Sequence, residues 1–218
     1  MDGRVERRCA AAMLLLLWAS FCQAAPEPAA TPVSEDVRLA ANWILRAADH
    51  QRLPFAIVDK KAASIHVYDP GGRLIGASPV LLGLASGDES VSDIARRAPG
   101  SLAPGERTTP AGRFASEPGH NDQGEAIVWI DYDASLAIHR LRPAPKHERR
   151  AARMASGSPA DRRISNGCIV VPVAFYETVV SPGLGRQRGF VYVLAESRPP
   201  SAMFHDDAVG MGAPGPPG

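Results

Sequence analysis

The residue with the most evident chemistry is a cysteine near the C-terminal end of the chain. Cys168 follows a glycine, Gly167, and precedes the apolar, β-branched residues 169–171. A glycine lets the chain turn tightly and bring the thiol to a surface. Backbone N–H groups at this turn could converge on an oxyanion, as acyl transfer requires. We interpret Cys168 as a nucleophile; a buried, inert cysteine is the alternative.

A cysteine nucleophile needs a base, because a free thiol with a pKa near ~8.5 is mostly protonated at neutral pH. The chain has six histidines, and any of them could approach Cys168 in space. His139 ends the apolar run 136–138, and the end of a strand would hold an imidazole rigidly. Cysteine and histidine form the smallest nucleophile–base pair. We therefore expect His139 to be the base.

The N-terminal segment is typical of a secretory signal. Three arginines among the first eight residues precede an apolar stretch of about twelve residues, shorter than the roughly twenty residues of a membrane-spanning helix. We expect residues 1–25 to be cleaved on export to the periplasm or cell envelope, with no stable membrane insertion; a retained lipid or membrane anchor is the alternative. Cleavage would remove Cys9 and Cys22 and leave Cys168 as an unpaired thiol in an oxidising compartment.

Charge is balanced over the chain and uneven along it. There are 24 basic and 23 acidic residues, and cleavage after residue 25 would leave 21 of each. No global field therefore favours nucleic acid or an anionic membrane as a partner. Residues 140–163, however, carry eight basic and two acidic side chains. This excess just before Cys168 indicates a basic rim around a site, or else a solvated surface loop.

Short β runs dominate the elements that must position these residues, which predicts a mainly β fold, a β-sandwich or partly closed barrel. One N-terminal helix of about fifteen residues is expected from Ser34, with Pro54 barring its continuation, and a short helix at 173–180. The long aperiodic segment 85–108 is typical of a functional loop. Strands are expected at 55–58, 64–68, 73–76, 79–82, 112–114, 126–132, 135–139, 169–171 and 190–194.

The length suits one domain with its own core. We expect this domain at residues 34–197, with its core at 55–195. Residues 26–33 are typical of a flexible spacer. The tail 198–218 is rich in proline and glycine and is predicted to be disordered.

Three segments, in this order, resemble the L,D-transpeptidase (YkuD-type) catalytic domain. They are Thr-Thr-Pro-Ala-Gly-Arg-Phe at 108–114, Ile-His at 138–139, and Ile-Ser-Asn-Gly-Cys-Ile-Val-Val-Pro at 164–172. They match the family's TPxGxF-like strand segment, strand-borne histidine and Ser-His-Gly-Cys motif. The resemblance covers roughly residues 55–195. It implies a mainly β, exported enzyme, here expected to be monomeric, that acts on peptidoglycan stem peptides with no metal and no organic cofactor.

The resemblance also implies a reaction. Cys168 would attack a carbonyl of a stem tetrapeptide, release the terminal D-alanine and leave a thioester. An amine of a second stem would then resolve the thioester into a 3→3 cross-link. His139 would be the base, and the turn Ser165-Asn166-Gly167-Cys168 would supply the oxyanion pocket. The backbone carbonyl of Arg140 would orient the imidazole.

The sequence departs from the family pattern at two motif positions. Asn166 stands where the family usually has histidine, and Val170 where it usually has asparagine. The interval of 26 positions from His139 to Ser165 is also longer than the family's usual spacing. These departures indicate a divergent subgroup. An L,D-carboxypeptidase that uses water as acceptor, and a non-catalytic envelope-binding module of the same fold, are alternatives.

Four further residues are candidates for orienting or binding the substrate. Arg140 and Arg142 directly follow the proposed base, and arginine recognises carboxylates, such as those of a stem peptide, through two parallel hydrogen bonds. Thr109 and Gly112 are expected to shape a loop beside the site. A solvated strand end and an ordinary turn are the respective alternatives.

Overall fold

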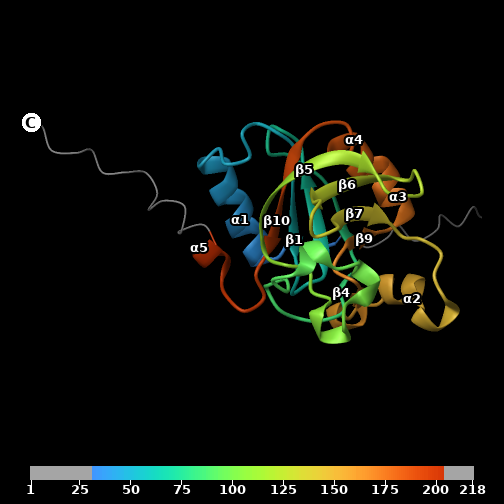
Figure 1. Cartoon of the computed structure of the whole chain (residues 1–218). Helices are drawn as coiled ribbons and strands as arrows, with labels where there is room; N and C mark the ends of the chain where they lie inside the picture. The colour runs from blue at the N-terminus through green and yellow to red at the C-terminus, as the bar shows by residue number, and fades with distance from the viewer. Residues whose placement is uncertain (1–30, 204–218) are drawn as a thin grey trace, which may run out of the picture.

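An eight-stranded mixed sheet forms the centre of the computed structural model, which describes residues 31–203 (Figure 1). Its strand order is β3-β2-β1-β10-β5-β6-β7-β9, with β1–β10 and β7–β9 parallel. A separate parallel pair, β4–β8, lies at one end. The strands are β1 (Phe55–Asp59), β2 (Ser64–Tyr68), β3 (Leu74–Pro79), β4 (Leu82–Gly83), β5 (Gly112–His120), β6 (Ala126–Asp131), β7 (Leu136–Arg140), β8 (Arg163–Ser165), β9 (Ile169–Val171) and β10 (Gly189–Leu194).

The two outer strands of the sheet meet through the chain that follows β3. The N–H of Val80 donates to the carbonyl of Ala63 at 3.0 Å, and Leu81 exchanges two backbone hydrogen bonds of 2.9 Å with Val170 of β9. These bonds satisfy edge groups that would otherwise be open to other chains. The sheet is thus nearly closed, which confirms the predicted mainly β fold with a partly closed barrel.

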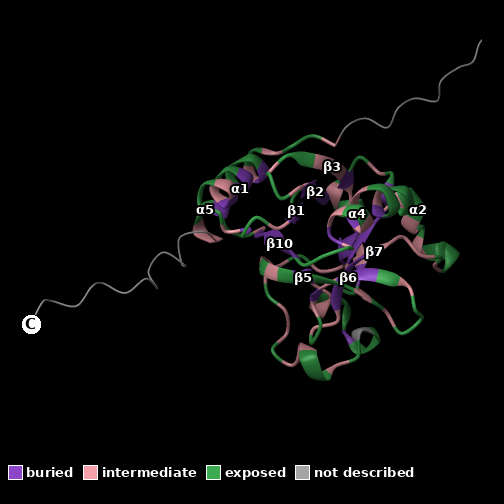
Figure 2. Ribbon diagram, turned by 90° about the horizontal axis from the view of Figure 1, so that it is seen from above, coloured by how far each residue is buried: buried purple, intermediate pink, exposed green. Residues whose placement is uncertain are grey.

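Side chains alternate between two apolar cores because successive strand residues face opposite sides of a sheet. Val58 of β1 and Val191 of β10 point into the barrel, whereas their neighbours Ile57 and Tyr192 pack against helix α1 (Glu35–Arg46). Figure 2 shows buried positions along the central strands β1 and β10. Ser34 caps α1 as expected, since its Oγ accepts the Val37 N–H at 3.2 Å.

The remaining helices are short. The helix predicted at 173–180 is present and runs on to residue 183, as α3 (Val173–Phe175), a π-helical turn (Tyr176–Val180) and α4 (Ser181–Gly183). The basic segment, residues 140–163, contains α2 (Arg150–Met154) between two 3₁₀ turns, Lys146–Glu148 and Pro159–Arg162. The long loop holds three more 3₁₀ turns, at Ile94–Arg96, Pro99–Ser101 and Pro104–Glu106.

The start of the predicted disordered tail is ordered. Pro200–Met203 form the short helix α5, in which Pro200 is buried and Met203 packs against the cluster under α1. The N–H of Ala195 donates to the Met203 sulphur at 3.3 Å. Composition misled here, because proline is well tolerated in a first helical turn and methionine fills irregular apolar gaps.

The predicted signal peptide 1–25, residues 26–30 of the spacer and residues 204–218 of the tail lie outside the described residues. Within residues 31–203, no helix is long and apolar enough to cross a membrane.

Candidate active site

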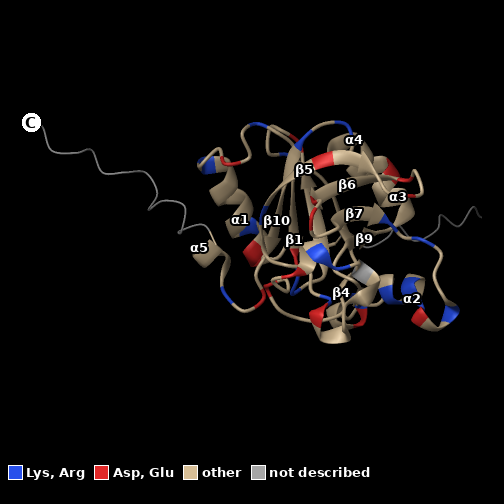
Figure 3. Ribbon diagram, viewed as in Figure 1, with Lys and Arg blue, Asp and Glu red and all other residues tan. Residues whose placement is uncertain are grey.

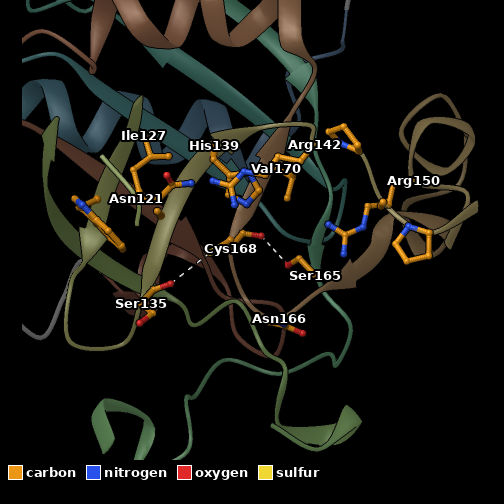
Figure 4. Close-up of a pocket in the computed structure, with 15 residues that line it drawn as sticks. Asn121, Ile127, Ser135, His139, Arg142, Arg150, Ser165, Asn166, Cys168 and Val170 are labelled. Atoms are coloured by element: carbon orange, nitrogen blue, oxygen red, sulfur yellow. Dashed lines mark hydrogen bonds between the residues drawn. The ribbon is translucent and has the colours of Figure 1, made fainter. Parts of the chain in front are cut away.

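The structure brings Cys168 and His139 to one cavity. Cys168 closes the turn between β8 and β9, and His139 lies on β7, the parallel neighbour of β9, where it is paired with Val170. Both side chains line a cavity of about 360 Å³ together with Trp129 and Val170 (Figure 4). The predicted nucleophile and base therefore line the same cavity, although they lie 29 positions apart in the sequence.

The thiol of Cys168 is held in its neutral form. Its Sγ donates to the carbonyl of Ser135 at 3.4 Å. Burial raises the pKa of the Cys168 thiol, and this effect outweighs the opposing influence of the Ala137 N–H and the Arg142 charge. A thiol in this environment reacts well only if a base takes its proton as the nucleophile attacks.

His139, the predicted base, has the properties that such a role requires. The side chain is buried, with 7% exposure, and its Nδ1 lies 2.8 Å from the backbone carbonyl of Arg140. A carbonyl only accepts, so this contact assigns the proton to Nδ1 and leaves Nε2 with a free lone pair. Burial lowers the pKa of His139 to about 4, with the charges of Arg142 and Arg150 acting in the same direction. The imidazole is neutral at pH 7, the form that accepts a proton.

The turn before Cys168 requires glycine. Gly167 has φ +132°, and a Cβ there would lie 3.0 Å from the carbonyl oxygen of Thr108. Ser165 fixes this turn, since its Oγ donates to the Cys168 carbonyl at 2.7 Å and accepts the Gly167 N–H at 3.1 Å. The Gly167 N–H is therefore already used. The expected oxyanion pocket would therefore draw on other donors of this turn, such as the N–H of Cys168, and not on that of Gly167.

Thr109 supports this turn, whereas Gly112 belongs to the central sheet. Thr109 is fully buried; its Oγ1 donates to the Gly167 carbonyl at 2.7 Å and accepts the Gly83 N–H at 2.8 Å. Gly112 begins β5 and pairs with Val193. Neither residue lines a cavity next to Cys168. We expected the two residues to shape a loop beside the site; in the structure they have structural roles.

A second, smaller cavity of about 30 Å³ borders Cys168, Ser135 and Asn166, residues that also line the first cavity. Its outer wall is the long loop 85–108, through Ser90, Ile94, Leu102, Glu106 and Thr108. The thiol thus lies between two cavities. Asn166 is exposed and borders both of them.

The two arginines after His139 differ in position. Arg140 turns away from the cavity, with its Nε 2.7 Å from Glu125, an Nη 3.4 Å from Glu177 and its guanidinium 5.5 Å from the centre of the Tyr176 ring. Its side chain is therefore no substrate ligand, and the structure corrects that expectation. Arg142 lines the cavity, with its Nε 2.5 Å from the other carboxylate oxygen of Glu125.

The basic segment is ordered and forms one wall of the larger cavity. Met154 of α2 is buried against Leu81 and Val170, and Arg150 faces the cavity. Figure 3 shows the positive charges gathered along this segment, beside β9. Sequence reasoning missed two residues, Arg150 and Glu125. The charge excess at 140–163 pointed to the first, and no local signal distinguished Glu125, which approaches from the turn between β5 and β6.

Within residues 31–203, no group of three or more histidine, cysteine or acidic side chains is arranged to hold a metal ion.

No protein-family model and no curated protein sequence matches the chain. Its fold is similar to several solved structures at low identity. The helical cell shape determining protein Pgp2 from Campylobacter jejuni is 14% identical over 73% of this chain and 56% of that one, with a TM-score of 0.43. An L,D-transpeptidase from Mycobacterium smegmatis is 14% identical over 65% and 58%, with a TM-score of 0.40.

The catalytic domain of the E. faecium L,D-transpeptidase is 18% identical over 64% of this chain and 95% of that domain, with a TM-score of 0.36. All of these likenesses are distant. The chain spans little more than half the length of the Campylobacter and Mycobacterium structures.

Proposed function

We propose that the chain is a cysteine acyltransferase, an L,D-transpeptidase that acts on peptidoglycan stem tetrapeptides in the periplasm or cell envelope. One observation carries this proposal: a neutral thiol and a neutral imidazole with a free Nε2 line the same cavity. Acyl transfer needs this pair, whereas an envelope-binding module would not. The substrate class comes from the sequence resemblance, in which the motifs around residues 108–114, His139 and Cys168 follow one another in the same order as in the family.

The geometry suggests how the steps would proceed. As the Cys168 sulphur bonds to the carbonyl carbon of the donor, its proton passes to His139 Nε2, and the Arg140 carbonyl stabilises the imidazolium that forms. The bond to the terminal residue breaks, and the proton goes to the leaving amine. An acceptor amine then attacks the thioester, loses its proton to His139 and releases the thiolate, which that proton restores to the thiol.

The departures from the family motif leave this proton path intact. Asn166 is exposed between the two cavities and is not in contact with the imidazole Nδ1, which is bonded to the Arg140 carbonyl. Val170 packs against Met154 of the basic segment, which gives its apolar side chain a structural role. Both observations favour a working enzyme over a non-catalytic module. The larger cavity would suit the donor; water in place of an amine as acceptor would make the protein an L,D-carboxypeptidase.

The test is a mass-spectrometric assay of a disaccharide tetrapeptide with the wild type and Cys168→Ala. A transpeptidase releases D-alanine and forms a cross-linked dimer, whereas a carboxypeptidase yields only the tripeptide. Both products should be absent with Cys168→Ala. Equal binding of the tetrapeptide to both proteins without any product would contradict the enzyme and support the binding module.

A further inference from the structure

Two guanidinium groups reach into the larger cavity beside Cys168. Arg142 comes from the segment after β7, and Arg150 begins α2 (Figure 4). Arg150 donates a hydrogen bond from Nε to Glu148 at 2.5 Å, and Arg142 forms an ion pair with Glu125 at the same distance. Among the described residues, no other hydrogen bond or ion pair involves either guanidinium. The terminal amino groups of both forks are therefore available to a ligand.

The two formally charged side chains that line the cavity are both positive. Its fifteen lining residues include both arginines and no aspartate or glutamate. The two anchoring carboxylates, Glu125 and Glu148, lie outside the lining and hold the guanidiniums from behind. The charges also act at His139: after burial, which is the largest influence, Arg142 and Arg150 lower the pKa of this imidazole, while the Arg140 carbonyl and the charge of Glu125 raise it.

Packing and hydrogen bonds of α2 fix the position of Arg150. Met154, one turn further along α2, is 6% exposed and packs against Leu81 and Val170. Arg153 donates to the carbonyls of Glu148 and Asp161, at 3.0 and 2.9 Å. The helix is thus fixed to the edge of the barrel, and the first residue of this helix is held at the cavity.

We propose that Arg142 and Arg150 form a carboxylate-binding site that holds the α-carboxylate of the residue leaving the acyl donor. This assignment rests on the proposed function. Guanidinium forks bind carboxylates through paired, charge-assisted hydrogen bonds. In a tetrapeptide stem, the terminal carboxylate belongs to the residue directly beyond the scissile bond, so it must lie close to Cys168 during attack. The site would therefore select donors that end one residue after the scissile bond and reject amidated or extended ones.

The first test needs no turnover. Cys168 is alkylated with iodoacetate and with iodoacetamide, two reagents of similar size of which only the first carries a carboxylate. We expect the rate ratio of iodoacetate to iodoacetamide to fall about five- to tenfold in Arg150→Gln, since one nearby positive charge is lost. Arg150→Lys, which keeps the charge without the fork, should retain part of the ratio.

Arg149→Gln is the matched control, because Arg149 is the adjacent residue, carries the same charge and lines a different cavity. Its ratio should equal that of the wild type. An unchanged ratio in Arg150→Gln would overturn the proposal. So would an equal fall in Arg149→Gln, since a general field would then explain the preference. A wild-type thiol that neither reagent modifies would also overturn it, because the cavity would then be closed.

The second test identifies the carboxylate. Binding of a stem tetrapeptide and of its C-terminal carboxamide is measured by calorimetry on Cys168→Ala, with and without Arg150→Gln. We expect the carboxamide to bind about tenfold more weakly, and Arg150→Gln to abolish the difference. Equal binding of both peptides would overturn the assignment to the leaving residue. An intact iodoacetate preference in a protein without peptide turnover would instead count against the proposed function alone.

Discussion

At the scale of single residues, both members of the proposed reactive pair, the Cys168 thiol and the His139 imidazole, are neutral. Burial keeps the proton on the Cys168 thiol and keeps His139 unprotonated at pH 7. A preformed thiolate–imidazolium pair would place two charges in a desolvated site, at a cost that their mutual attraction repays only with good geometry. We therefore infer that proton transfer accompanies attack.

This neutral pair predicts an unusual pH dependence. Because the pKa of the Cys168 thiol is raised, its thiolate fraction at pH 7 is below that of an ordinary cysteine. The alkylation rate with neutral iodoacetamide should keep rising beyond pH 9 in the wild type, and glutathione serves as the reference thiol. A plateau between pH 6 and 8 would contradict this account, since it would report a thiolate already formed near neutrality.

Glu125 is a residue whose part in the site only the folded chain reveals. It contacts both Arg140 and Arg142, and the two arginines outweigh the effect of burial so that the pKa of Glu125 lies below its usual range. The sequence shows that two arginines closely follow His139, but it does not show that Glu125 contacts both of them. Only the pairing of β5, β6 and β7 brings Glu125 to them.

At the scale of elements, a buried polar network links the long loop 85–108 to the turn that carries Cys168. The Nζ of Lys60 is fully buried; it contacts Asp88 at 2.8 Å and donates to the carbonyls of Gly87 and Thr109 at 2.5 and 3.0 Å. Thr109 in turn holds the Gly167 carbonyl. The loop that walls the second cavity and the turn that carries Cys168 are therefore fixed to the same point.

Removing the hydroxyl at the centre of this network tests the link. Thr109→Val keeps the shape of the side chain and loses the hydrogen bonds to Gly167 and from Gly83. We expect the free energy of unfolding to fall by about 1–3 kcal/mol, measured by urea denaturation, and Cys168 acylation to slow. Thr109→Ser retains the hydroxyl and should keep most of both. A larger loss in Thr109→Ser than in Thr109→Val would show that methyl packing, not hydrogen bonding, holds the turn.

The strands and the start of the first helix were predictable where the sequence pattern is local. The β runs around residues 55–58, 126–132 and 190–194 carry enough β-branched and aromatic residues to be recognised as strands, and Ser34 marks the start of α1. The ordered basic segment was not predictable, because its anchor is a single methionine, Met154, packed against residues about 70 and 16 positions away. Long-range packing of this kind has no local sequence pattern.

At the scale of the whole molecule, the nearly closed barrel explains how the site is assembled. The proposed nucleophile, Cys168, comes from the turn before β9 and the proposed base, His139, from β7; these strands pair in parallel, and both side chains line the same cavity. The resemblance in sequence predicted both roles. It did not identify the cavity wall, because the wall comes from the basic segment and the long loop, which lie outside the family motifs.

The charge distribution belongs to this scale as well. The chain as a whole is close to neutral, with 24 basic and 23 acidic residues. The positive charge is concentrated where Arg142 and Arg150 border the cavity. A neutral molecule with a local positive site would attract a carboxylate-bearing ligand at short range and would not bind polyanions generally.

The central claim is that Cys168 is an acylable nucleophile activated by His139. The most direct measurement is the intact mass of the protein after incubation with a carbapenem, whose strained lactam acylates a thiol without losing a leaving group. The account predicts a gain of one carbapenem mass on Cys168, absent in Cys168→Ala and much slower in His139→Gln. No adduct on the wild type, or the same adduct on Cys168→Ala, would contradict it.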